Sequence, residues 1–397
     1  MTCIAMCLAC NEKDGPDVWP SGNVLVPEDV ARLLASVPIG DEQVREVLDA
    51  VGASSGNGYD EEYPMKNLLS VPGSGVGDDV AGVKSSPSYS YPLRDMLRDE
   101  LEKAPSTKTG GFDVVRPGDM SVDEYLSELE RSGLQIYWPF SDLTSGMDEL
   151  PVLTFDPEDE SLTNVGYRLV VDGSGRRSVE EITVDEDYAM HHPVWVVNRN
   201  DDCDCTTLEL LRKMDPGWAD GEGFITVDHH PSEAPTKAKT CKSLVLKDFT
   251  MNRNFDNWFA GGSEFWIKVG SVEDFVASTE AELKLYSPQI TDFMIVVKRS
   301  ELGEAKPYNV MLVSEWTEQL ERCALMIVED DGGTRTSWSC SCIVKVESKS
   351  YGFDMSLPLN SHDDIVWRGQ LSYSYLSSHS GQKGHFGDVD LTFDIVN

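Results

Sequence analysis

Three short apolar runs decide the fold of the C-terminal half: Thr291-Asp-Phe-Met-Ile-Val-Val297, Asn309-Val-Met-Leu-Val313 and Ala324-Leu-Met-Ile-Val328. Short β-branched or aromatic runs separated by turn residues are typical of buried β-strands. Runs of the same kind predict further strands at 243–247, 264–269, 341–346, 369–375 and 388–395. About eight strands at this spacing favour an antiparallel β-sandwich over residues 241–397.

The middle of the chain, residues 134–240, shows the same pattern. Apolar or aromatic runs separated by Asp, Gly, Pro and Ser occur at 134–140, 151–155, 166–171, 179–184 and 193–198. They predict a β-rich middle domain with antiparallel character.

Residues 11–133 form a helical and loop-rich N-terminal region. Apolar residues at helical spacing predict two short helices within 27–52, and 91–103 and 121–132 are further helix candidates. Residues 53–90 are rich in Ser, Gly, Pro and Asp and have no period, which is typical of loops. The chain as a whole is therefore predicted to be α+β and β-rich.

The charge balance narrows the classes of partner. The 397 residues include 33 Lys and Arg against 69 Asp and Glu, which gives a formal net charge of −36. Nucleic acid or an anionic membrane surface would repel such a body, so we exclude nucleic acid as a partner. The acidity can serve solubility or cation binding, and solubility is the favoured interpretation because net charge alone does not define a site.

The first ten residues form an apolar run that ends in Leu8-Ala9-Cys10. This ending resembles the lipobox of bacterial cell-envelope lipoproteins of the Bacteroidota type, and the resemblance covers residues 1–10 only. It implies a signal peptide, lipidation of Cys10 and an outer-membrane or cell-surface location with the membrane reached through the lipid. Glu12 and Asp14 are similar to the surface-export signals of that group. No Lys or Arg precedes Cys10, so we expect the true start codon to lie upstream.

Histidines in the middle region suggest a first site. His191 and His192 precede one predicted strand, and Asp228, His229 and His230 lie further along. One histidine of each pair with Asp228 or a thiolate could hold Zn²⁺. The spacing matches no recognised zinc motif, and adjacent strand residues point to opposite faces, so surface or hydrogen-bonded histidines are the favoured interpretation.

Paired acids in the C-terminal region suggest a second site. Asp330 and Asp331 follow an apolar run, and Asp363 and Asp364 precede Ile365. Acidic loops at one end of a β-sandwich resemble the calcium loops of C2-type modules, and flexible carboxylates suit Ca²⁺. A simple turn is the favoured alternative, since Asp and Gly are preferred there. The calcium hypothesis requires the two loops to meet in space.

Aromatic residues and cysteines leave further alternatives open. Aromatic side chains around Gly261 and Gly262 can form a glycan platform or, as favoured, core packing; they are Trp258, Phe259, Phe265 and Trp266. Six cysteines beyond the N-terminal run can pair in an exported protein or remain reduced: Cys203, Cys205, Cys241, Cys323, Cys340 and Cys342.

These patterns predict a lipid-anchored envelope protein that acts as a non-enzymatic surface module binding protein, glycan or Ca²⁺. The alternative is a metal-dependent hydrolase with the His/Asp site of the middle domain. The chain has no Gly-x-Ser-x-Gly elbow and no His-Glu-x-x-His motif, so an enzyme is the less favoured class.

Overall fold

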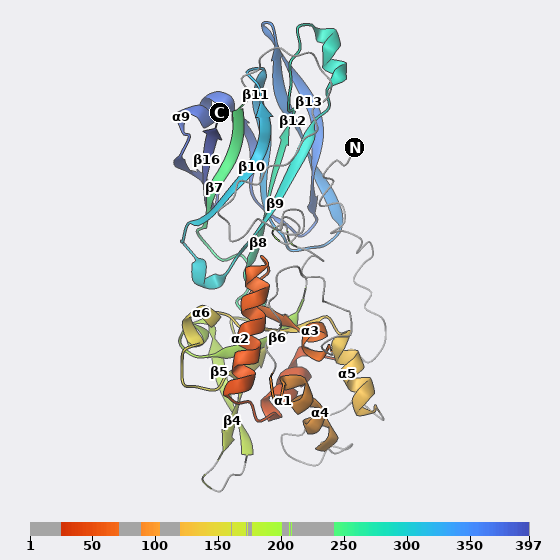
Figure 1. Cartoon of the computed structure of the whole chain (residues 1–397), viewed down its shortest axis with the longest axis vertical. Coiled ribbons are helices and arrows are strands. Elements are labelled where there is room, and N and C mark those ends of the chain that lie inside the picture. The colour runs from red at the N-terminus through yellow and green to blue at the C-terminus, as the bar shows by residue number, and fades with distance from the viewer. Residues whose placement is uncertain are drawn as a thin grey trace.

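The protein is described here from a computed structural model that covers residues 25–70, 89–103, 120–159, 161–171, 173, 177–200, 206, 208 and 242–396. The fold is α+β and β-rich, with its helices mostly in the N-terminal half and three sheets, as the sequence predicts. An N-terminal α/β unit and a C-terminal β-sandwich lie end to end along the longest axis (Figure 1).

The sheet of the N-terminal unit has six strands. Their order is β1 (Glu62–Pro64), β2 (Leu134–Tyr137), β6 (Val194–Arg199), β3 (Val152–Phe155), β4 (Thr163–Val171) and β5 (Arg177–Asp185). Neighbouring strands are antiparallel except β3 and β6, which run parallel.

Helices cover one face of this sheet. They are α1 (Pro27–Ser36), α2 (Asp41–Gly56), α3 (Met65–Leu69), α4 (Leu93–Lys103) and α5 (Val122–Glu130). Their apolar faces form one core with the sheet, in which Leu33 and Leu97 pack in the same cluster as Ile136 and Trp195. The helices predicted within 11–133 and the strands predicted from 134 onward therefore share one core. The reason is physical: short amphipathic helices bury their apolar faces only against another layer.

The C-terminal sandwich consists of two antiparallel sheets. One has the order β10 (Lys306–Trp316), β7 (Lys242–Met251), β16 (Val389–Val396), β15 (Gln382–Phe386). The other has the order β13 (Lys349–Asn360), β12 (Arg335–Val346), β11 (Leu320–Glu329), β8 (Ser263–Ser271), β9 (Gln289–Val297), and β14 (Asp364–Ser372) also pairs with β11. A single apolar core lies between the sheets.

Strand β11 contributes to apolar clusters on both of its faces. Leu325 and Ile327 belong to the core between the sheets, whereas Met326 and Val328 belong to a second cluster with Leu357 and Leu359 of β13. This alternation follows from the two-residue period of a strand. It also explains why the run Ala324–Val328 is continuously apolar, since both faces are buried.

Some local predictions need correction. Strands β1, β13 and β15 were not predicted; β13 contains Gly352 and Pro358, which interrupt a strand pattern but are tolerated where the strand lies at the edge of its sheet. The strand predicted at 369–375 ends at Ser372. There the Ser372 hydroxyl accepts a hydrogen bond from the Tyr375 amide and caps α9 (Tyr373–Ser378).

Candidate metal centre

The two acidic loops of the sandwich meet in space. The His362 amide donates to the carbonyl of Gly332 at 3.2 Å, and the Asn360 side chain donates to Asp330 at 3.1 Å. Asp330, Asp331, Asp363 and Asp364 therefore lie at the same end of the sandwich, which is the spatial condition that the calcium hypothesis required.

Three of these four acids are engaged in shaping the loops. Asp330 accepts hydrogen bonds from the indole of Trp266 at 2.9 Å and from the Gly332 amide at 3.1 Å. Asp363 accepts from the Asn360 amide at 2.7 Å, and Asp364 lies 3.9 Å from Arg253. The donors already held by these carboxylates reduce their capacity to bind an ion.

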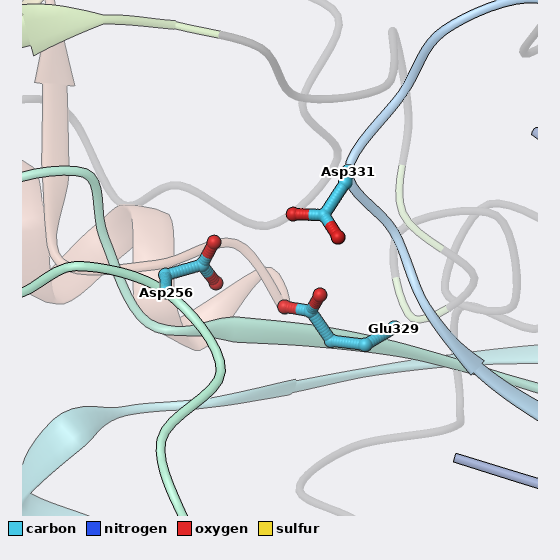
Figure 2. A group of neighbouring side chains, drawn as sticks. All are labelled: Asp256, Glu329 and Asp331. Carbon is cyan, nitrogen blue, oxygen red and sulfur yellow. The ribbon is translucent and has the colours of Figure 1, made fainter. Parts of the chain in front are cut away.

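The fourth acid, Asp331, belongs to a group that the sequence did not indicate. Asp331, Glu329 and Asp256 each offer a carboxylate oxygen, and these oxygens all lie within 4.8 Å of one another. Figure 2 shows the three carboxylates turned toward a common space. Glu329 is the last residue of β11, Asp331 lies in the loop after it, and Asp256 lies in the connection between β7 and β8.

Glu329 is the buried member of the group. Its side chain continues the face of β11 that carries Leu325 and Ile327, opposite Phe265 of β8, so a carboxylate stands at the margin of the apolar core. The residue is only 1% exposed, and among the described residues neither carboxylate oxygen has a hydrogen-bond partner. Asp256 is half-buried and Asp331 exposed, so the group opens toward solvent on one side.

The electrostatics of the group disfavour three free negative charges. Burial first, and then the charge of Asp256, raise the pKa of Glu329 far above its ordinary value, and the nearby Glu264 amide opposes this shift only weakly. Burial also raises the pKa values of Asp256 and Asp331. Without a bound cation, the Glu329 carboxyl is therefore neutral, and its O–H can donate a hydrogen bond to the Asp256 carboxylate. A bound cation would replace that proton.

The donor set matches a hard cation. All three groups are carboxylates, and Ca²⁺ takes 6–8 oxygen ligands at about 2.3–2.6 Å, with water or carbonyl groups completing the set. Two ligands on opposite sides of such an ion stand about 4.6–5.2 Å apart. Oxygens within 4.8 Å of one another are therefore close enough to share one ion.

The histidine hypothesis receives no such support. His191, at the end of α7 (Glu186–His191), is exposed, and its Nδ1 lies 2.7 Å from the carbonyl of Asp187. His192 stacks on Tyr188 and has its Nδ1 2.9 Å from Glu149. Asp228, His229 and His230 lie outside the described residues, as do Cys10, Glu12 and Asp14.

The aromatic and cysteine candidates are buried or unpaired. Trp258, Phe259, Phe265 and Trp266 are all at most 6% exposed, so their rings are core packing and offer no open glycan platform. Cys323, Cys340 and Cys342 are free thiols. Cys203, Cys205 and Cys241 lie outside the described residues.

Sequence reasoning found Asp331 but missed its two partners. The apolar run ends at Val328, and the acidic turn pattern that follows does not mark Glu329 as a ligand. One feature of the sequence could have indicated Glu329. It follows Leu325 and Ile327 in the two-residue period of the strand, so its side chain is expected to point toward the same buried face. Asp256 has no local signal, because only the tertiary fold brings the β7–β8 connection to the end of β11.

Comparison with known proteins identified no relative of the chain. No protein-family model matches the chain, and neither a curated protein nor a solved structure similar to it was found. Within the described part of the chain, no helix combines the length and apolar composition needed to cross a membrane.

Proposed function

We propose that the protein is a non-enzymatic binding module of the bacterial cell envelope, attached through a lipid on Cys10, whose body binds Ca²⁺ at Asp256, Glu329 and Asp331. One observation carries the metal proposal: the Glu329 carboxylate is almost fully buried, lacks a hydrogen-bond donor among the described residues and faces two further carboxylates. A buried charge of this kind requires a proton or a cation. The envelope location is supported by the Leu8-Ala9-Cys10 ending.

Calcium is favoured over other ions by the chemistry of the ligands. Zn²⁺ is typically held by His or Cys, and the group contains neither. Mg²⁺ demands near-octahedral geometry at about 2.0–2.1 Å and retains several waters. Three carboxylates from two segments, the β7–β8 connection and the end of β11, suit the larger and more adaptable coordination sphere of Ca²⁺.

Isothermal titration of metal-stripped protein with CaCl₂ tests the proposal. We expect one site in the wild type, loss of that site in Glu329→Gln and an unchanged site in Glu318→Gln. Glu318 is an exposed glutamate that precedes the opposite end of β11, so it matches the charge change without touching the group. Absence of calcium binding in the wild type, or equal binding by Glu329→Gln, would refute the proposal.

A further inference from the structure

The connection between β7 and β8 joins the two halves of the molecule. Its Asn257 side chain donates to the carbonyl of Ser161 at 2.9 Å, and the Trp258 indole donates to the carbonyl of Leu162 at 3.0 Å. Both acceptors belong to the N-terminal unit, immediately before β4. The residues directly after Asp256 are therefore held by the other half of the chain.

The rest of the connection is held in the same way. The Asn198 side chain of β6 donates to the carbonyl of Phe259 at 3.0 Å, and the Gly262 amide donates to Asp60 at 2.6 Å. The rings of Trp258 and Phe259 pack in an apolar cluster that includes Tyr137 and Val196 of the N-terminal sheet. The connection thus inserts from the sandwich into the α/β unit.

Arg299 fixes Asp256 at the boundary. Its side chain is 4% exposed, donates to the backbone carbonyls of Asp256 and Gly261 at 3.1 Å each, and pairs with Glu186 of α7 at 2.8 Å. The backbone of Asp256 is therefore tied to the junction, while its carboxylate faces Glu329 of the sandwich (Figure 2).

We infer that a divalent cation at Asp256, Glu329 and Asp331 controls the docking of the two halves, holding the β7–β8 connection against the sandwich when bound and loosening it when removed. This inference rests on the proposed calcium site. Acidic residues alone would not define such a site. The additional observation is that the Glu329 side chain is 1% exposed, has no hydrogen-bond partner in the described part of the chain and is aimed at the other two carboxylates. Removal of the cation leaves mutual repulsion, or a single shared proton, where the ion had joined the β7–β8 connection to the end of β11.

Hydrogen exchange of the full chain with and without CaCl₂ tests this inference. The reporter is the segment 254–262, whose Gly262 amide bonds across the junction to Asp60. If opening requires release of the ion, Ca²⁺ at 100 times its Kd should slow exchange there by about 100-fold. Residues 349–354 of β13, at the end of that strand far from Asp330 and the acidic loops, should exchange equally in both conditions.

Two variants separate the inference from the site on which it rests. Glu329→Gln should abolish the calcium-dependent protection of 254–262, and Asp331→Asn, which changes an exposed residue, should reduce it while leaving the fold intact. Calcium binding by titration with no change in exchange at 254–262 would overturn the inference and leave the site standing. No calcium binding at all would overturn the proposed function and the inference with it.

Discussion

Two buried glutamates near the junction are neutralised in different ways. Glu61, fully buried before β1, accepts hydrogen bonds from the Ser141 amide at 3.1 Å and the Ser141 hydroxyl at 2.5 Å and lies 3.6 Å from Lys298. Glu329, almost as deeply buried, faces the carboxylates of Asp256 and Asp331. Described residues supply the donors and the counter-ion for one oxygen of Glu61, Oε1, and leave Oε2 without a partner. For Glu329 the described residues supply no hydrogen-bond donor and no counter-ion, which separates a structural ion pair from a site that must take a proton or a cation from solution.

The largest effect is expected at the structural pair. Lys298→Met should lower the free energy of unfolding by about 3 kcal/mol at pH 8, because Glu61 would stay buried without its counter-ion. Burial, with the charge of Asp60, already raises the pKa of Glu61 to about 7. Its folded-state pKa thus exceeds the ordinary value, so its contribution to stability is present at low pH and is lost as the pH rises through about 7.

The loss in Lys298→Met should therefore be smaller at pH 5 than at pH 8, as measured by urea unfolding at both pH values. An equal loss at both would show that Lys298 stabilises the fold by packing alone. Calcium should still stabilise this variant, because the metal group does not include Lys298.

The second-largest effect is the increase in the free energy of unfolding when Ca²⁺ is added. Ca²⁺ at 100 times its Kd should raise the free energy of unfolding of the wild type by about 2.7 kcal/mol. The same addition should leave Glu329→Gln unchanged, because the buried ligand is gone. Urea unfolding with and without CaCl₂ measures this change. If calcium stabilises Glu329→Gln as much as the wild type, Glu329 is not a ligand, and the proposed difference between Glu61 and Glu329 is wrong.

Without a cation, we expect the Glu329→Gln substitution to have a smaller effect on the free energy of unfolding, and one that stabilises the fold. Glu329→Gln should be more stable than the wild type by about 1–2 kcal/mol at pH 8. Keeping the buried Glu329 carboxyl protonated above its ordinary pKa costs free energy, whereas a neutral amide can donate to Asp256 and Asp331 at every pH. The raised pKa of Glu329 means that its contribution to stability is present at low pH and declines as the pH rises above its ordinary value. The advantage of the variant should therefore grow with pH.

Unfolding of both proteins in a chelator from pH 5 to pH 8 checks this trend. Asp256, Asp331 and Asp363 also have raised pKa values, so the difference between variant and wild type, and not the wild-type curve alone, isolates Glu329. A variant that is less stable at every pH would contradict the account.

The smallest effect is expected at the exposed ligand. Asp331→Asn should weaken calcium binding by about tenfold, equivalent to about 1.4 kcal/mol, since solvent screens its charge and water can replace one oxygen. Asp364→Asn removes an exposed acid outside the metal group and should leave the affinity within about twofold. Titration of both variants gives the comparison, and equal weakening by the two would indicate a general charge effect instead of coordination.

Sequence patterns predicted the elements whose residues alternate or repeat clearly. The apolar run Ala324–Val328 predicts β11, and the helical pattern of 121–132 predicts α5, which begins with a capping box at Ser121. The sequence did not predict the edge strand β13, because Gly352 and Pro358 interrupt its strand pattern. Of the three residues of the metal group, the sequence predicted only Asp331. Glu329 directly precedes a turn motif and was not distinguished from it. Asp256 is brought to Glu329 by tertiary packing, which no local sequence pattern encodes.

The most direct measurement is a crystal structure of the protein in CaCl₂ with anomalous data collected for the ion. The account predicts an anomalous peak about 2.3–2.6 Å from carboxylate oxygens of Asp256, Glu329 and Asp331. A well-ordered Glu329 carboxyl hydrogen-bonded to Asp256, with no peak between the three residues at saturating calcium, would contradict it.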